Sequence, residues 1–208
     1  MNAPAVTYKN IIFDFGGVII NIDYHLTTKA FRELGLDNFD ELFSKLKQSD
    51  LFDRYEKGLI SSSDFRTALK SNFHLNVDDA TFDKAWNAML LDIPTERLAL
   101  LKRLKSTHRT FLLSNTNEIH IDTIYERMKT EMNIPDFSVY FEKIYLSYKV
   151  KMRKPDIEIF ELVLNENNLD PAETLFIDDS PQHLEGAKKL GIQTYWLDVN
   201  KESIMDLF

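Results

Sequence analysis

The chain has 208 residues, of which 44% are hydrophobic and 28% are charged, so it can bury a core and is not a largely disordered polypeptide. A net charge of −8 argues against a nucleic-acid partner, because phosphate contacts need clustered lysine and arginine. The absence of cysteine excludes disulfides and thiolate metal sites. No apolar run approaches the length of a membrane span and no signal-peptide pattern opens the chain, so we expect a cytoplasmic protein with no membrane partner.

Five short apolar runs predict the strands of a parallel sheet whose two faces are both covered. They span residues 10–15, 110–114, 143–147, 174–178 and 193–197. Helical patterns lie between the later runs, at residues 116–132, 155–167 and 181–190. Strands that alternate with helices predict a doubly wound α/β fold, that is, a Rossmann-like core.

The segment between the first two runs, residues 16–109, is far longer than one crossover helix requires. Apolar residues recur there at helical spacing, as in Phe39, Leu42 and Phe43, then Phe65, Ala68 and Leu69, then Phe82, Ala85 and Trp86. We therefore predict a small all-helical insert of four helices. The predicted organisation is a core domain of residues 1–20 and 95–208, with a helical domain of residues 21–94 inserted after the first strand.

Polar residues stand at the ends of three predicted strands. Asp14 is in the first run, Ser114 ends the second, and Asp178 is followed by Asp179 at the end of the fourth. In an open parallel sheet, ligands bind beyond the carboxyl ends of the strands. We therefore expect these side chains to meet in one crevice.

The residue types in that crevice suggest phosphoryl transfer. Asp14 precedes a Gly-Gly pair, where the backbone can turn sharply and a ligand can approach, which suits a nucleophile. Carboxylates from a second strand call for a cation, and an oxygen-only ligand set favours Mg²⁺. The Ser114 hydroxyl and the backbone N–H groups of residues 115–117 suit an anion, and Lys154 can neutralise phosphate oxygens.

Each of these residues also has an ordinary structural interpretation. Asp14 before two glycines is typical of a turn, Ser114 can bond the backbone, and the segment 178–181 can cap the next helix. The five histidines show no metal-ligand spacing, so a zinc site is not expected. Three other basic residues compete with Lys154 for the role of the cation: Lys149, Lys151 and Arg153.

Four motifs, taken together and in order, resemble those of the haloacid dehalogenase superfamily. They are Ile-Ile-Phe-Asp-Phe-Gly-Gly-Val at 11–18, Leu-Leu-Ser-Asn-Thr at 112–116, Arg-Lys-Pro-Asp at 153–156 and Phe-Ile-Asp-Asp-Ser at 176–180. The resemblance covers nearly the whole chain, and the helical insert resembles the type 1 cap of that family. It implies that Asp14 is the catalytic nucleophile.

The resemblance also implies the remaining roles. Ser114 would bind the transferring phosphoryl group with Asn115 beside it, and Lys154 would steady both nucleophile and phosphoryl charge. The Mg²⁺ ligands would be Asp14, the backbone carbonyl of Gly16, and Asp179. Asp178 would serve beside Asp179 as a further ligand or as its support.

Gly16 departs from the family's pattern. Phosphatases of the family usually have an aspartate there, which acts as general acid and base and lends its carbonyl to the metal. Gly16 retains the carbonyl but has no proton to give, and general acid catalysis is worth about 10²- to 10⁴-fold in rate. An activated ester such as a sugar 1-phosphate is therefore favoured. The chain is similar in this respect to the glucose-1-phosphate phosphatase branch, which has glycine at that position.

We therefore expect a hydrolase, a magnesium-dependent phosphatase that cleaves a small phosphomonoester through an aspartyl-phosphate, with sugar phosphates favoured. One alternative is a metal-independent 2-haloacid dehalogenase, in which the aspartate attacks carbon and no leaving-group acid is needed. Another is a non-catalytic phosphate-binding relic. The sequence predicts no oligomeric state. Candidates for substrate recognition in the insert are Asp23, Tyr24, Arg54 and Glu56.

Overall fold

A five-stranded parallel sheet forms the centre of the larger half of the molecule. The computed structural model describes residues 8–47 and 50–208, so the first seven residues of the predicted core segment and two of the insert lie outside it. The strands are β1 (Asn10–Phe13), β2 (Arg109–Ser114), β3 (Lys143–Leu146), β4 (Thr174–Asp178) and β5 (Gln193–Trp196). Their order in the sheet is β3-β2-β1-β4-β5, with every pair parallel. The five predicted strands are confirmed, with small differences at their ends.

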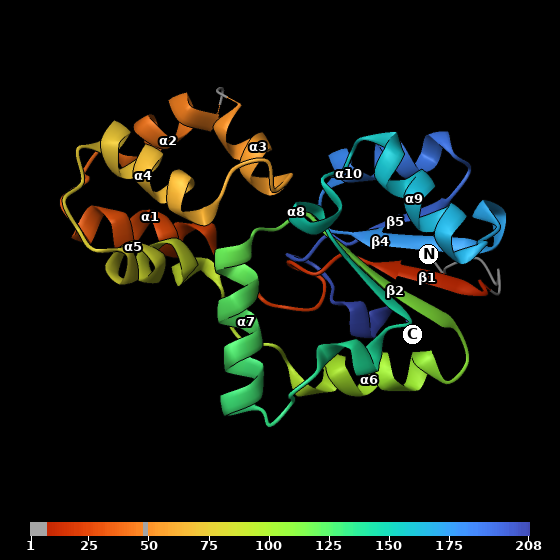
Figure 1. Cartoon of the computed structure of the whole chain (residues 1–208). Helices are drawn as coiled ribbons and strands as arrows, with labels where there is room; N and C mark the ends of the chain where they lie inside the picture. The colour runs from red at the N-terminus through yellow and green to blue at the C-terminus, as the bar shows by residue number, and fades with distance from the viewer. Residues whose placement is uncertain (1–7, 48–49) are drawn as a thin grey trace.

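Helices cover both faces of the sheet, as a doubly wound fold requires (Figure 1). They are α6 (Thr95–Lys105), α7 (Glu118–Glu131), α8 (Ser147–Val150), α9 (Ile157–Asn167) and α10 (Pro181–Lys189). Side chains of β1 alternate between two hydrophobic clusters, so that Ile11 and Phe13 pack on one side and Ile12 on the other. The sequence pattern did not predict α6 or α8, because α8 is a single turn and the leucines of α6 do not keep one helical face.

A helical unit stands between β1 and β2 in the chain. It consists of α1 (Tyr24–Glu33), α2 (Phe39–Lys47), α3 (Leu51–Glu56), α4 (Ser62–Phe73), α5 (Asp79–Trp86) and the 3₁₀ turn η1 (Asn87–Met89). The prediction of four helices is wrong, because the described residues of the unit form five α-helices, and α3, at six residues, is too short to produce a strong periodic signal. Ser61 and Asp78 cap α4 and α5, since their side chains accept from the backbone N–H groups of Asp64 and Thr81.

The helical unit has an aromatic core of its own. Phe65 is fully buried, stacks on Tyr55 at 3.9 Å between ring centroids, and meets Trp86 edge to face at 5.1 Å. Trp86 also stacks on His120 of α7 at 5.5 Å, and burial lowers the pKa of His120 to about 3, so this imidazole is neutral. The unit therefore rests on α7 (Figure 1).

No helix in the described part of the chain is long and apolar enough to cross a membrane.

Two linkers join the helical unit to the sheet and pair with each other. The backbone N–H of Asn21 donates to Asp92 O at 2.9 Å, and Leu91 N–H donates back to Asn21 O at 3.0 Å. Arg127 of α7 holds the second linker, donating to the carbonyls of Leu90 and Leu91 at 2.9 and 2.8 Å. The linker geometry is thus fixed from the core side by one guanidinium group.

Replacing that group tests its contribution. Arg127→Met keeps the aliphatic stem but removes both donors, and we expect a loss of about 1–3 kcal/mol in the free energy of unfolding, because the linker carbonyls lose charge-assisted hydrogen bonds. Urea titration followed by circular dichroism measures it. Lys129→Met, an exposed change on the same helix, is the control. Equal stability of the two variants would show that the linker does not depend on Arg127.

Candidate active site

The polar strand ends meet where the strand order reverses. The chain runs outward from β1 through β2 and β3 on one side, then returns to β4 and β5 on the other, so the crevice lies between β1 and β4. Asp14 follows β1 and bonds β4 through its backbone N–H, 2.9 Å from Ile177 O. Carboxylate oxygens of Asp14, Asp178 and Asp179 all lie within 4.8 Å of one another.

Lys154 lies at the centre of this cluster with its side chain fully buried. Its ammonium group donates three hydrogen bonds: to Asp14 Oδ1 at 2.6 Å, to Asp178 Oδ2 at 2.6 Å, and to the backbone oxygen of Leu113 at 2.9 Å. Burial alone would lower the pKa of Lys154, but the two carboxylates raise it above its usual value. Lys154 is therefore a fixed cation with no donor left over.

The side chain of Asn115 holds the backbone of Lys154 in place. Its Nδ2 donates to Lys154 O at 2.8 Å, and its Oδ1 accepts from Lys154 N–H at 2.9 Å. The Asn115 amide is therefore committed to positioning the lysine, and its backbone N–H remains as the group that can meet an anion. The sequence reasoning placed Asn115 near phosphate but did not foresee this bond to Lys154.

Ser147 is a residue that the sequence reasoning missed. It is fully buried after β3, accepts from Thr116 N–H at 2.9 Å, and donates to Thr116 O at 2.9 Å. These bonds tie the loop after β2, which carries Ser114, to the next strand. The available signal is its position, because a serine at the end of a predicted strand repeats the pattern of Ser114. None of the described residues hydrogen-bonds the Ser114 hydroxyl, which leaves it for a ligand.

Asp14 is buried, and its two carboxylate oxygens differ. Oδ1 accepts from Lys154, whereas Oδ2 accepts no hydrogen bond from the residues that the structure describes. Burial raises the pKa of Asp14 to about 7 against the opposing effect of Lys154, and the charges of Asp178 and Asp179 add to the increase. A divalent cation beside it would favour the ionised form that a nucleophile needs.

The two adjacent carboxylates of β4 have different surroundings. Asp178 is fully buried and accepts from Lys154, from Ser180 N–H at 2.8 Å and from His183 Nδ1 at 3.0 Å. Burial would raise the pKa of Asp178, but Lys154 and His183 hold it below its usual value. Asp179 is half-buried without such partners, and burial together with the charge of Asp178 raises the pKa of Asp179 to about 6. Asp179 is therefore the better placed of the two to bind a cation.

The two glycines after β1 have different constraints. Gly17 has a φ of +72°, and a Cβ there would lie 2.4 Å from Asp179 Oδ2, so the backbone can approach this carboxylate only as glycine. Gly16 is outside the left-handed region, and a Cβ there would meet only the side chain of Ile22, 2.6 Å from its Cδ1. The space beside Gly16 is thus filled by an aliphatic side chain from the first linker.

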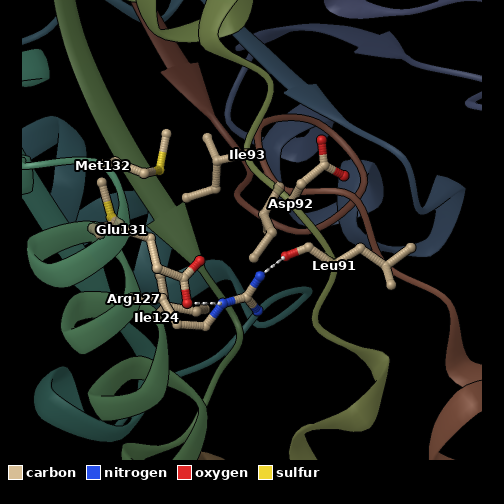
Figure 2. A pocket seen from close by; sticks show the side chains of 9 residues that line it. Leu91, Asp92, Ile93, Ile124, Arg127, Glu131 and Met132 are labelled. Carbon is tan, nitrogen blue, oxygen red and sulfur yellow. Dashed lines mark hydrogen bonds and ion pairs between the residues drawn. The ribbon is translucent and has the colours of Figure 1, made fainter.

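The other basic residue of the third motif, Arg153, faces elsewhere. Arg153 pairs with Asp53 at 3.3 Å and with Glu56 at 3.1 Å, both in the helical unit, so it joins that unit to the core. Lys154 is the cation inside the cluster. A cavity of about 230 Å³ lies beside the second linker, lined by Arg127, Ile93 and Met132 among others (Figure 2). None of the three clustered carboxylates lines it.

Comparison with known proteins identifies the family. The haloacid dehalogenase-like hydrolase family matches residues 8–191. The chain belongs to this family. Its relatives include D-ribitol-5-phosphate phosphatase of Bacteroides thetaiotaomicron, which is 32% identical over 187 residues that cover 90% of each chain. This agrees with the resemblance carried by the four motifs.

Solved structures of the family agree in fold over nearly the full length. A haloacid dehalogenase (HAD) family enzyme from B. thetaiotaomicron, solved with magnesium and inorganic phosphate, is 39% identical with a TM-score of 0.87, covering 97% of this chain and 99% of the other. A HAD-like family hydrolase from Porphyromonas gingivalis is 29% identical with a TM-score of 0.83, covering 97% and 96%. L-2-haloacid dehalogenase of Xanthobacter autotrophicus, at 18% identity and a TM-score of 0.60, shares the fold.

The residues of the cluster fit a hard divalent cation. Three carboxylates face one lysine, so the group carries excess negative charge in a mostly buried place, and all the available donors are oxygens. The raised pKa values of Asp14 and Asp179 express the same excess. A haloacid dehalogenase-like site of this kind is completed by Mg²⁺ more readily than by zinc.

Protons should compete with the cation. Since burial raises the pKa of Asp14 to about 7 and that of Asp179 to about 6, both groups bind protons as the pH falls below those values. We expect the Mg²⁺ dissociation constant to rise about tenfold or more between pH 7.5 and pH 5.5, with proton release on binding. Calorimetric titration in buffers of different ionisation enthalpy measures both. An affinity that does not change with pH would contradict the raised pKa values.

The two glycines should respond differently to substitution. Gly17→Ala places a methyl group against Asp179 and forces a positive φ on alanine, so we expect weaker Mg²⁺ binding and a loss of stability of about 1–3 kcal/mol. Gly16→Ala meets only the flexible end of Ile22, and we expect a smaller loss with Mg²⁺ affinity retained. Calorimetry and urea unfolding of both variants test the contrast. Equal Mg²⁺ affinities would mean that Gly17 does not shape the cation site.

Proposed function

We propose that this protein is a magnesium-dependent phosphatase that hydrolyses a small phosphomonoester, with a sugar or sugar-alcohol phosphate as the favoured class. The observation that carries the proposal is Asp14, whose Oδ1 is held by Lys154 while Oδ2 remains open toward the crevice. The family relatives support it, since one is named a ribitol phosphate phosphatase and another was solved with magnesium and inorganic phosphate.

In the proposed reaction, Asp14 Oδ2 attacks phosphorus and the bond to the leaving oxygen breaks, which forms an aspartyl-phosphate. The Ser114 hydroxyl and the backbone N–H of Asn115 hold the phosphoryl oxygens, and Lys154 keeps Asp14 oriented. Water then cleaves the acyl phosphate and releases inorganic phosphate. Mg²⁺, held by Asp14, the Gly16 carbonyl and Asp179, supplies positive charge for the phosphoryl oxygens when it is bound.

We further propose that residues 21–94 act as a cap over a core of residues 1–20 and 95–208. The ion pairs of Arg153 with Asp53 and Glu56 support this, because they link the helical unit directly to the loop that carries Lys154. A second link pairs Lys57 of the unit with Asp156 at 3.3 Å. The leaving group would lie between these elements and the aspartates.

Two types of substrate within this class differ in their leaving group. The missing acid at Gly16 favours an anomeric phosphate, whose leaving group departs easily, whereas a relative named for D-ribitol 5-phosphate acts on the ester of a primary alcohol. Both belong to the proposed class of small polyhydroxylated phosphates. A panel that contains sugar 1-phosphates, terminal sugar phosphates and polyol phosphates separates them.

Asp14→Asn is nearly isosteric but cannot form an acyl phosphate, so we expect the rate of phosphate release to fall by at least about 10³-fold with the fold retained. Excess EDTA should abolish wild-type activity and Mg²⁺ should restore it. Asp37→Asn, an exposed change in the helical unit, is the control. Full activity in EDTA together with halide release from a 2-haloacid would identify a dehalogenase instead, and Mg²⁺ and phosphate binding without turnover would identify a relic.

A further inference from the structure

The leaving group needs a proton that Gly16 cannot provide. The position beside Gly16 is occupied by Ile22, whose Cδ1 lies where a side chain would begin. If the ester is that of an alcohol, its oxygen would leave as an alkoxide unless another group protonates it. The first linker, which brings Ile22 to this place, is therefore where a replacement should be sought.

The first linker also directs Tyr24, two residues after Ile22, toward the same crevice. Ile22 pairs with Leu90 in an antiparallel bridge, and Asp23 N–H donates to Met89 O at 3.0 Å, so the backbone is extended up to the start of α1. Side chains two residues apart on an extended backbone point to the same side. Tyr24 therefore follows Ile22 toward the mouth of the site.

The Tyr24 side chain is accessible to a ligand and lies within the influence of nearby carboxylates. The residue is 69% exposed, the highest value among the large hydrophobic side chains of the described chain. Surrounding protein nevertheless raises the pKa of Tyr24 to about 12, with burial as the largest cause, followed by the charges of Asp179 and Asp14 and then of Glu56. These causes agree with the linker geometry, which puts Tyr24 on the same side of the backbone as Ile22. A phenol with an ordinary pKa is already protonated at neutral pH, so the hydroxyl carries a proton whether or not a cation offsets the carboxylates.

Other candidates on the linker are less suited. The Asp23 carboxylate accepts from His25 N–H at 2.9 Å and caps α1. No hydrogen bond to the Tyr24 hydroxyl exists within residues 8–47 and 50–208, so its proton is available to a ligand. Tyr24 is also the first residue of α1, where the helix itself holds its backbone in place.

We propose that Tyr24 is the leaving-group acid of this chain, a further catalytic residue that rests on the proposed phosphatase function. As Asp14 Oδ2 forms its bond to phosphorus, the bond from phosphorus to the ester oxygen breaks, and the electron pair stays with that oxygen. The Tyr24 hydroxyl donates its proton to the same oxygen, which leaves as an alcohol. The phenolate then takes a proton from water, so that charge and atoms balance over one turnover.

The proposal predicts a dependence on the leaving group. A phenol is a weak acid, but an alkoxide is a far stronger base than a phenolate, so proton transfer to a departing alcohol oxygen is favourable. A nitrophenolate leaves readily without a proton. Removing the hydroxyl should therefore affect alkyl phosphates selectively, whereas loss of a binding contact would affect both kinds of ester alike.

Tyr24→Phe provides the test, because it removes one oxygen from an exposed side chain and leaves the ring. Single-turnover release of the leaving group is measured over a series from nitrophenyl phosphate to alkyl and polyol phosphates. We expect alkyl and polyol rates to fall about 10²-fold or more, nitrophenyl rates to change less than about threefold, and the dependence on leaving-group pKa to become steeper. Tyr125→Phe, a half-exposed tyrosine on α7, is the matched control.

The outcomes separate this proposal from the one on which it rests. Nitrophenyl phosphate turnover that needs Asp14 reports on the phosphatase function alone. With that turnover present, equal losses on all esters in Tyr24→Phe, or no loss on any, would overturn the assignment of Tyr24 as the acid. Absence of turnover on every ester by the wild-type protein would overturn the phosphatase function and the role of Tyr24 with it.

Discussion

The buried ammonium group of Lys154 is the contact on which the site and much of the core depend. It bonds Asp14 of the loop after β1, Leu113 of β2 and Asp178 of β4, so one group joins three adjacent strands at their carboxyl ends. Removing one partner of a buried ion pair generally costs about 3–5 kcal/mol, because the other charge is left without compensation. The same bonds that stabilise the sheet edge therefore fix Asp14, the proposed nucleophile.

This arrangement explains why the carboxylate of Asp179 is available to bind a cation. Lys154, Ser180 N–H and His183 compensate the charge of Asp178, whereas no side chain among the described residues donates a hydrogen bond to Asp179. The cluster keeps a net negative charge in a low-dielectric place, which raises the pKa of Asp14 and of Asp179. A cation that brings its own positive charge removes this penalty, so the site selects a divalent ion by charge as much as by ligand type.

The sequence predicts the parts of this site that depend on strand ends. Asp14, Ser114 and the Asp178-Asp179 pair each stand at the end of an apolar run, and parallel topology alone brings such ends together. Lys154 is predictable only from its motif, because nothing in the spacing of four nearby basic residues distinguishes the buried one. The hydrogen bonds of Asn115 to the Lys154 backbone and of Ser147 to the Thr116 backbone depend on loop geometry, which hydrophobic periodicity does not encode. The predicted helix count of the insert is wrong because α3, at six residues, is too short to show a helical period.

Sequence patterns also do not predict which group replaces the acid that is missing at Gly16. A missing carboxylate is visible in the first motif, but its replacement depends on how two linkers, far apart in the chain, pair with each other. That pairing brings Ile22 against Gly16 and sets the start of α1, where Tyr24 stands. An acid on the loop after β1 would belong to the sheet domain, whereas the proposed acid, Tyr24, belongs to the helical unit. Under this proposal the position of the proton donor is tied to the position of the helical unit, and the linker held by Arg127 becomes part of what sets the chemistry.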